Sequence, residues 1–530
     1  MSKIISIYDT TLRDGAQTVG ISFSIQDKIN ITKILNSLKI DYIEGGWPGS
    51  NPKDDSFFSE IKKIPIDHSK ITAFGSTRRK EFTCSNDASI QALVNSKADV
   101  LTIVAKTWDF QVTKALNMKL DENLILIHDT VAYLKDLGFE VFLDAEHFFD
   151  GHKTNEDYSM KCLEKACSAG IDMIVLCDTN GGTLPAEIHK ITAAVTSSIK
   201  VPVGGHFHND TGVAVANSMY AVDAGAVSIQ GTINGYGERC GNCDLTTFIP
   251  NLVLKMGYDC SSKSVLPHIT EVSRSVSEIA NLAPIENKPY VGDNAFAHKG
   301  GIHVSALQKD TRTYEHIDPT LIGNRRKVMI SELSGKSNIE FKAKELGIDI
   351  NKDINVSKKV LAKIKNLEEK GFQFDAAEGS FELIIREATG EYIPFFKFLG
   401  FRLITEMDEA NRMECEATIK IEVGGILEHT AANGNGPVDA IANALRKSLT
   451  KFFPEIEKMF LTDYKVRVLD DNNSGTASNV RVLIDQTDGI DHWGTVGVSS
   501  NIIEASWMAL VDGIEYLLYK NSKKNSCIFF

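Results

Sequence analysis

The segment Asp172-Met-Ile-Val-Leu-Cys-Asp-Thr179 is a short apolar run that ends in polar residues, and this pattern indicates the fold because it recurs along the first half of the chain. Eight such runs occur, each followed by a stretch with apolar residues at helical spacing, such as Ile25–Leu38 and Glu122–Leu137. Continuous apolar runs are typical of buried parallel strands. Eight strand–helix units in about 260 residues favour an α/β protein with a closed (β/α)8 barrel over a doubly wound sheet. The runs are Ile4–Thr10, Asp41–Gly46, Ile71–Thr77, Val100–Lys106, Glu140–Glu146, Asp172–Thr179, Val201–Asp210 and Val227–Gly235.

Polar residues gather at the ends of these runs. In a barrel of parallel strands all the carboxyl ends lie at one rim, and such barrels carry their chemistry there. We therefore expect the functional site at this rim. The residues concerned are Asp9, Asp14, Glu44, Arg78, Lys106, Glu146, Asp178, His206, His208 and Asn234.

Length and composition are those of a globular protein with several domains. The chain has 530 residues, enough for about three domains. Its 43% hydrophobic and 24% charged residues argue against disorder, and its net charge of −13 argues against nucleic acid as a partner. No apolar run is long enough to cross a bilayer, Met1–Asp9 lacks a signal-peptide pattern, and the 9 cysteines are scattered. We therefore expect a cytoplasmic protein with reduced thiols and no membrane partner.

Beyond the predicted barrel the pattern changes twice. The next region is mostly helical and includes the charged helix Val356–Lys370. Alternating strands then return in two similar blocks, Glu414–Leu449 and Val480–Tyr519, each with the order strand, strand, turn, helix. We predict a catalytic barrel over residues 1–270, a helical linker over 271–370, and a C-terminal α+β regulatory domain of two β-β-α repeats over 371–525.

A divalent metal site is predicted from three residues. His206 and His208 lie two residues apart on one predicted strand, so both imidazoles point to the same face. Asp14 follows the first strand and reaches the same rim. A carboxylate with two imidazoles suits an ion with open positions, and such mixed ligands favour Zn²⁺ or Mn²⁺ over Mg²⁺. The alternative is a pair of hydrogen-bonded core histidines.

Two charged residues near this group have two interpretations each. Arg13 precedes Asp14 and could polarise a carbonyl or hold a carboxylate, or it could form a structural ion pair with Asp9 or Glu44. Glu146 ends the fifth run and could be a general base or a partner in the barrel wall. Sequence alone leaves both choices open.

Several motifs resemble those of one enzyme family. The chain is similar to the acyl-CoA condensing enzymes of the metal-dependent TIM-barrel family, which includes 2-isopropylmalate, homocitrate and citramalate synthases. Gly425–Leu449 also resembles the C-terminal regulatory domain of the first and last of these, so the resemblance spans nearly the whole chain. Gly45–Lys53 and Ala297–His303 are more similar to the citramalate synthase branch. The family motifs are Asp9-Thr-Thr-Leu-Arg-Asp-Gly15, His206-Phe-His-Asn-Asp210 and Gly235-Tyr-Gly-Glu-Arg-Cys-Gly-Asn242.

The resemblance implies roles for individual residues. Glu146 is placed like the catalytic glutamate of the family, and His303 is placed where a histidine of the linker reaches a barrel, often that of a partner subunit, with Tyr314 assisting. Ser305 replaces an acidic residue common in relatives, so the assignment of the base to Glu146 or His303 stays open. The metal, Mn²⁺, Zn²⁺ or Mg²⁺, would be held by Asp14, His206, His208 and Asn242, and the 2-oxo acid by Arg13, Asp14, Thr179 and Gln17.

The same resemblance implies the reaction and its control. Acetyl-CoA, as co-substrate, would condense with pyruvate, and hydrolysis of the thioester would release (R)-citramalate and CoA for isoleucine biosynthesis. Isoleucine is the implied effector, and a homodimer or higher oligomer is the implied assembly. The alternatives are 2-isopropylmalate synthase acting on 2-oxoisovalerate, an aldolase or lyase on the same barrel, and a non-catalytic binding protein.

Overall fold

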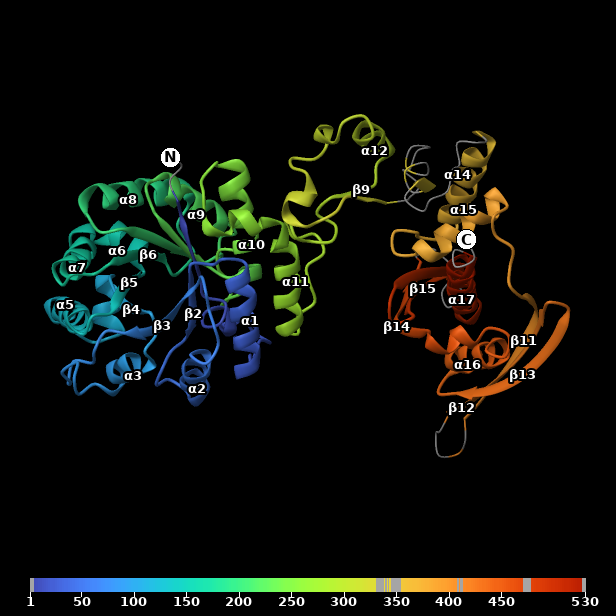
Figure 1. Cartoon of the computed structure of the whole chain (residues 1–530), viewed down its shortest axis with the longest axis horizontal. Coiled ribbons are helices and arrows are strands. Elements are labelled where there is room, and N and C mark those ends of the chain that lie inside the picture. The colour runs from blue at the N-terminus through green and yellow to red at the C-terminus, as the bar shows by residue number, and fades with distance from the viewer. Residues whose placement is uncertain are drawn as a thin grey trace. The chain divides into compact units, whose positions relative to one another are not determined.

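The computed structural model of the chain describes residues 4–329, 338, 341, 343–344, 354–407, 409, 413–469 and 478–526 (Figure 1). The chain divides into two compact units. The first comprises Met1–Phe296 and Ile317–Arg325, and the second comprises Ala297–His316 and Arg326–Phe530. Each unit is described by itself below. Among the described residues, no helix is long and apolar enough to span a membrane.

Eight parallel strands in the first unit close into a barrel, with β1 paired to both β2 and β8. The (β/α)8 barrel predicted from the apolar runs is therefore confirmed. The strands are β1 (Ser6–Asp9), β2 (Tyr42–Gly46), β3 (Lys70–Ser76), β4 (Val100–Lys106), β5 (Glu140–Glu146), β6 (Met173–Asp178), β7 (Val203–Phe207) and β8 (Ser228–Gly231).

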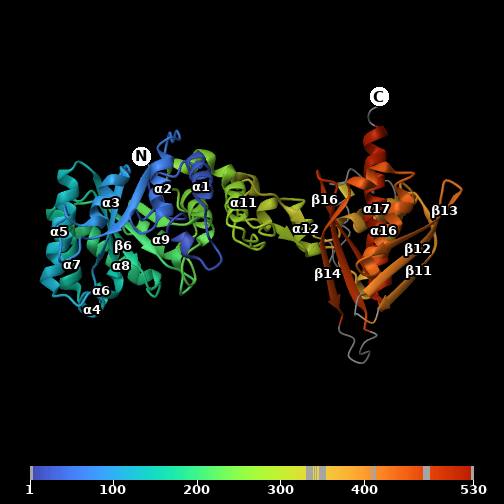
Figure 2. The ribbon, with the colours of Figure 1, turned by 90° about the horizontal axis from the view of Figure 1, so that it is seen from below.

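Helices surround the barrel, as Figure 2 shows. Their starts follow ordinary capping rules: Ser24 and Asp27 form a capping box at α1, and Asn51 caps α2 just before Pro52. The helices of this unit are α1 (Ile25–Ser37), α2 (Pro52–Ile61), α3 (Ala88–Ser96), α4 (Asp109–Lys114), α5 (Leu120–Asp136), α6 (Phe148–Thr154), α7 (Glu156–Ser168), α8 (Pro185–Ser198), α9 (Ala214–Asp223), α10 (Leu245–Pro250) and α11 (Ile269–Ile279).

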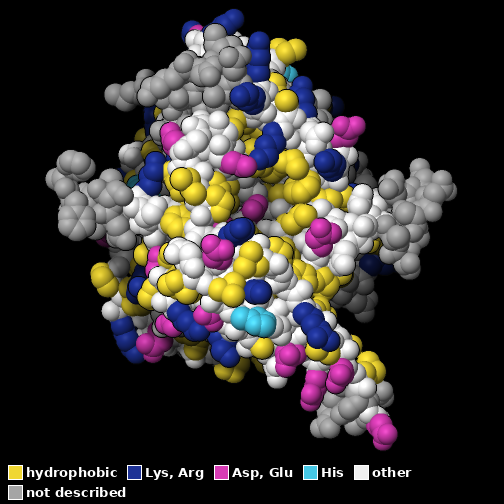
Figure 3. Space-filling view, turned by 90° about the vertical axis from the view of Figure 1, so that its right-hand side faces the viewer, with side chains coloured by type: hydrophobic (Ala, Val, Ile, Leu, Met, Phe, Trp, Pro, Cys, Tyr) yellow, Lys and Arg dark blue, Asp and Glu magenta, His cyan; other side chains and the backbone are white. Residues whose placement is uncertain are grey.

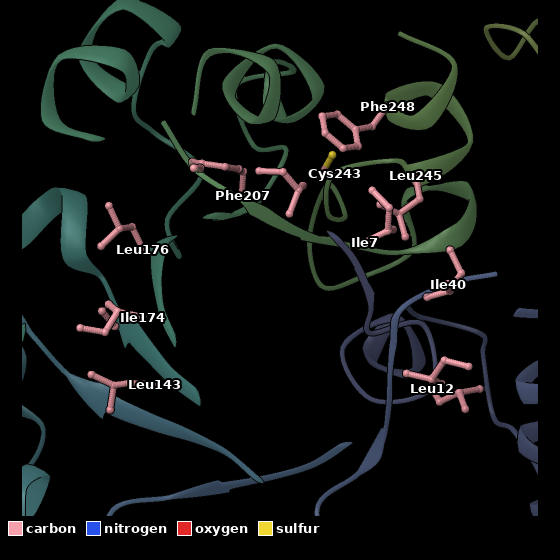
Figure 4. Close-up of a cluster of buried hydrophobic side chains, with 14 of the residues drawn as sticks. Ile7, Leu12, Ile40, Leu143, Ile174, Leu176, Phe207, Cys243, Leu245 and Phe248 are labelled. Carbon is pink, nitrogen blue, oxygen red and sulfur yellow. The ribbon is translucent and has the colours of Figure 1, made fainter. Parts of the chain in front are cut away.

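Side chains of the barrel strands alternate between two apolar clusters. In β6, Ile174 and Leu176 belong to the large cluster between strands and helices, part of which Figure 4 shows. Val175 and Cys177 from the same strand belong to a smaller cluster inside the barrel. This alternation follows from the two-residue period of a strand, and it leaves the strand ends to carry polar groups.

The N-terminal part of the second unit contains short strands and helices. The strands β9 (Ala297–His298) and β10 (Lys327–Val328) pair in parallel, and the helices include α12 (Gly301–Leu307) and α14 (Ile354–Glu369). The last of these agrees with the predicted charged helix. The predicted domain boundaries at 270 and 370 remain a prediction.

Two antiparallel three-stranded sheets, each followed by a helix, form the C-terminal part, which confirms the predicted α+β architecture. Each block is preceded by one further strand that lies outside its predicted bounds. In the first block the extra strand is β11, whose residues are exposed or half-buried on both faces, so the strand lacks the alternation that reveals β12. The elements are α15 (Glu378–Thr389), β11 (Lys397–Met407), β12 (Met413–Val423), β13 (Ile426–Gly434), α16 (Pro437–Leu449), β14 (Phe460–Val468), β15 (Val480–Thr487), β16 (His492–Ser499) and α17 (Ile502–Ser526).

Candidate active site

A cavity of about 770 Å³ opens at the carboxyl ends of the barrel strands, where the sequence predicted the site. Its lining comes from the loops after several different strands, as barrel sites usually do. Six of the residues to which the resemblance assigns a role line it, together with two further residues of the predicted rim, Arg78 and Lys106. The six are Arg13, Asp14, Gln17, Glu146, Thr179 and His208.

Asp14, His206 and His208 form a buried group whose potential ligand atoms all lie within 4.8 Å of one another. The Nε2 atoms of the two histidines are 3.2 Å apart, and Asp14 Oδ2 lies 3.4 Å from that of His206 and 3.9 Å from that of His208. The alternative, a pair of core histidines that hydrogen-bond to each other, does not account for the Asp14 carboxylate that lies beside both imidazoles.

Protonation of this group favours a cation. Burial lowers the pKa of His206, and burial together with the neighbouring His206 lowers the pKa of His208 to about 3, so both imidazoles are neutral near pH 7. Burial alone would raise the pKa of Asp14, but the charges of Arg13 and the histidines outweigh it and lower that pKa. Neutral imidazoles and an ionised carboxylate are the forms that bind a divalent metal.

Asn242 lies beside this group, as predicted for a fourth ligand. His208 and Asn242 form an isolated β-bridge, and the Asn242 side chain also interacts with Asp14. Its Nδ2 donates to the carbonyl oxygen of Tyr236 at 3.1 Å, while its buried Oδ1 has no hydrogen-bond partner. A buried carbonyl oxygen without a partner is costly, so the residues present fit a metal ion.

Arg13 forms the ion pair of one interpretation, and its action on a substrate stays a prediction. Its Nε lies 2.8 Å from Glu44 Oε2, its Nη1 lies 3.4 Å from Asp14 Oδ2, and its guanidinium stacks 3.9 Å from the centre of the Phe74 ring. Asp9 is not its partner, because the Asp9 carboxylate accepts from the backbone and hydroxyl of Thr11. The ion pair with buried Glu44 therefore fixes a guanidinium that also faces the cavity.

Three polar groups line another part of the cavity. Glu146 forms an ion pair with Lys106 from the neighbouring strand. Thr179 Oγ1 accepts the backbone N–H of His147 at 3.0 Å, which directs the hydroxyl. Arg239 donates to the Thr179 carbonyl at 2.8 Å and pairs with Asp210 at 2.7 Å.

His303 and Tyr314 belong to the second unit, and the lining of the cavity described above comes from the first unit. Their rings are in contact, with centroids 4.1 Å apart and planes tilted by 31°. The predicted pair therefore comes together, and its role at a barrel stays a prediction.

Sequence reasoning missed three residues near the site. Gln230 and Asp144 contact the group through His206, and Arg239 lines the cavity. Arg239 stands inside the motif Gly235–Asn242, so the motif could have indicated it. Gln230 and Asp144 are isolated polar residues inside apolar runs, and a polar residue at a buried strand position is the only signal they give.

Three family models match consecutive parts of the chain. The HMGL-like model matches residues 4–276, the homocitrate synthase post-HMGL domain-like model matches 290–371, and the LeuA allosteric (dimerisation) domain model matches 375–518. The first covers more than half of the chain and contains the barrel with its metal-ligating group. The protein therefore belongs to the HMGL-like family of TIM-barrel enzymes.

Known proteins narrow this class further. The (R)-citramalate synthase of Geobacter sulfurreducens is 52% identical over 98% of this chain and 99% of its own length, and that of Aquifex aeolicus is 50% identical over 99% of each. The 2-isopropylmalate synthase of Methanocaldococcus jannaschii is 32% identical over 98% of this chain and 96% of its own length. Within the family, the chain groups with the (R)-citramalate synthases.

Proposed function

We propose that this protein is an (R)-citramalate synthase of isoleucine biosynthesis. It condenses acetyl-CoA with pyruvate and hydrolyses the thioester, giving (R)-citramalate and CoA. The observation that carries the proposal is the buried Asp14–His206–His208 group beside Arg13 in the barrel cavity, in a chain about half identical to such synthases along nearly its whole length.

The chain's own residues would prepare the 2-oxo acid. Asp14, His206 and His208 would hold the divalent ion, with Asn242 Oδ1 beside them. A divalent ion held there would supply Lewis-acid polarisation of the keto group of the substrate. Thr179 accepts a hydrogen bond from a backbone N–H, so its own hydroxyl hydrogen can be donated to the pyruvate carboxylate. Gln17 lies in the same lining and would contribute an amide.

Carbon–carbon bond formation needs a base and a counter-charge. Glu146, held by Lys106, would take a proton from the methyl group of acetyl-CoA. The resulting carbon nucleophile forms a bond to the keto carbon, and the keto oxygen takes up a proton to become the hydroxyl group. Arg13, fixed by Glu44, would offset the negative charge that develops. Water then cleaves the thioester to a carboxylic acid and the CoA thiol. His303 of the second unit is the alternative base.

Selectivity for pyruvate would come from steric exclusion. Trp47 and Phe74 both line the cavity next to Arg13, with ring centroids 5.3 Å apart. A methylene group is worth only about 1–3 kcal/mol in an apolar pocket, so a branched acid must be rejected by overlap with such rings. If the pocket instead admitted the branched 2-oxoisovalerate, the protein would be a 2-isopropylmalate synthase, which is the second candidate.

The C-terminal part is proposed to form a homodimer and to bind isoleucine. The match to an allosteric (dimerisation) domain supports both roles. β14 exposes Phe460, Leu461, Val466 and Val468, which is typical of a surface that another chain covers. Apolar side chains are also visible on the face in Figure 3, which is the side of Figure 1 where β11 and β13 are labelled. The turn before α16 is a poor site for the carboxylate of the effector. Its backbone N–H at Asn435 already donates to Asp439 at 2.8 Å and is not available to a ligand.

One experiment tests the reaction. Free CoA released from acetyl-CoA would be measured with pyruvate, 2-oxobutyrate and 2-oxoisovalerate, each with Mn²⁺, Zn²⁺ or Mg²⁺ added. We expect the highest kcat/KM with pyruvate. A higher kcat/KM with 2-oxoisovalerate would assign the protein to the isopropylmalate branch, and no release with any acid would refute the synthase.

A further inference from the structure

A chain of two hydrogen bonds holds the imidazole of His206 from behind. His206 Nδ1 lies 2.8 Å from Gln230 Oε1, and Gln230 Nε2 donates to Asp144 Oδ1 at 2.9 Å. All three side chains are at least 95% buried. They come from β7, β8 and β5, so the chain of bonds crosses the inside of the barrel.

Strand register makes this arrangement rigid. His206 and Gln230 are paired positions on the neighbouring parallel strands β7 and β8, so their side chains lie side by side on the same face. Asp144 stands two residues before the cavity residue Glu146 on β5. Each partner is thus fixed by a strand rather than by a loop.

The two bonds also fix where His206 carries its proton. Asp144 Oδ1 accepts from the amide nitrogen of Gln230, and the amide oxygen of Gln230 therefore faces His206. An amide oxygen can only accept, so Nδ1 of a neutral His206 must hold the hydrogen. Its Nε2 then presents a lone pair toward Asp14 Oδ2, 3.4 Å away.

His208 has no such support. Its Nδ1 is buried and has no hydrogen-bond partner among the described residues. The two imidazoles therefore differ, because one is oriented from outside the group and the other is not. A partner on the second ring nitrogen sets the tautomer and orientation of a metal-ligating histidine.

We propose that Gln230 and Asp144 are positioning residues that hold His206 in the tautomer and orientation needed for metal binding. The proposal rests on the metal site of the proposed function. It assigns the pair to metal affinity rather than to substrate contact, since neither side chain lines the cavity.

Metal affinity of the full-length protein tests this assignment. Equilibrium dialysis with Mn²⁺ would compare the unmodified protein with Gln230→Met, which keeps the approximate side-chain length but removes both hydrogen bonds. We expect affinity to fall about 10- to 100-fold, the usual effect of removing a partner of a ligating histidine. Gln230→Glu restores an oxygen beside His206 Nδ1. Burial raises the pKa of Asp144 to about 8, so its protonated carboxyl group can donate to the second oxygen of the new side chain. The affinity should therefore return to within about threefold of the unmodified protein.

Asn217→Leu is the matched control, because Asn217 is also a fully buried barrel amide and its Nδ2 donates to the Thr183 carbonyl at 2.9 Å. It should bind Mn²⁺ like the unmodified protein. If Gln230→Met does not fold, Asp144→Ala replaces it, with an expected loss of about threefold to tenfold.

Three results would overturn the proposal. One is unchanged Mn²⁺ affinity in the folded Gln230→Met or Asp144→Ala protein, and another is an equal loss in Asn217→Leu. The third is a Gln230→Glu protein that binds as weakly as Gln230→Met. Failure of the unmodified protein to bind Mn²⁺, Zn²⁺ or Mg²⁺ would instead refute the metal site itself, and with it the positioning role of Gln230 and Asp144.

Discussion

The barrel and the C-terminal part of the second unit bury polar groups in different ways. At the barrel rim, the Nε2 atoms of His206 and His208 converge on Asp14 Oδ2, so acceptor atoms face one another. In the C-terminal part, buried acids have donors: Glu382 pairs with Arg386 at 2.5 Å, and Glu515 accepts the backbone N–H of Phe395 at 3.1 Å.

The unpaired acceptors at the barrel rim mark a functional site, and the paired acids of the C-terminal part do not. Converging acceptors are unfavourable unless a cation joins them, and this cost is typical of a functional site. Paired acids are satisfied by the fold and need nothing further. Within the described part of the chain, no second group of three His, Cys, Asp or Glu residues brings its ligand atoms as close together.

Removing a ligand should have the largest effect. We expect His208→Ala to lower turnover by at least about 1,000-fold, because it takes one imidazole from the group that would hold the ion. The fold should remain, which circular dichroism checks, while elemental analysis should show loss of bound metal. His189→Ala is the control, since His189 is an exposed barrel histidine 3.4 Å from Asp223. A His208→Ala protein that keeps stoichiometric metal and most of its turnover would contradict the assignment of His208 as a metal ligand.

Changing the proposed base should have the next largest effect. Glu146→Gln is expected to lower kcat about 100- to 1,000-fold, with the KM for pyruvate changed less than about threefold, because a proton-transfer group acts mainly in the transition state. Steady-state CoA release measures both. A large rise in KM with unchanged kcat would make Glu146 a binding residue. A greater loss of kcat in His303→Ala would place the base in the second unit.

Removing the C-terminal part should abolish regulation and spare the metal. A chain that ends at Gly371 should bind metal like the full chain but show no inhibition by millimolar isoleucine. Some activity should be lost, because Val360 and Ile364 of α14 pack in one cluster with Phe381, which the truncation removes. Inhibition that persists in the short chain would locate the effector site in the barrel or linker, and a full chain that ignores isoleucine would refute the effector.

Two glycines should give the smallest effects. A Cβ at Gly231 would lie 2.5 Å from the Cys243 carbonyl oxygen in the barrel, and one at Gly434 would lie 2.2 Å from the backbone nitrogen of Ala440 in the C-terminal part. Each alanine variant should destabilise its own unit by about 1–3 kcal/mol, measured by calorimetry. Only Gly231→Ala should weaken metal binding. Gly182→Ala and Gly436→Ala, where a Cβ meets nothing within 4 Å, are the controls.

Periodic patterns made much of the fold predictable. The predicted runs Val100–Lys106 and Glu140–Glu146 coincide with β4 and β5, because strands buried on both faces are continuous apolar segments. The two-residue spacing of His206 and His208 likewise placed both on one face. β11 was not predicted, because few of its side chains are buried and burial is what imposes alternation.

The barrel, the helices around it, and the rim at which functional residues gather were predictable from the sequence, since these depend on the order and spacing of neighbouring residues. The partners of individual side chains could be read only from the folded chain. It chose Glu44 rather than Asp9 for Arg13, and it joined Gln230 to Asp144 across 86 positions of the chain. Barrel closure brings such residues together, and a hydrogen bond between distant strands leaves no periodic trace along the chain.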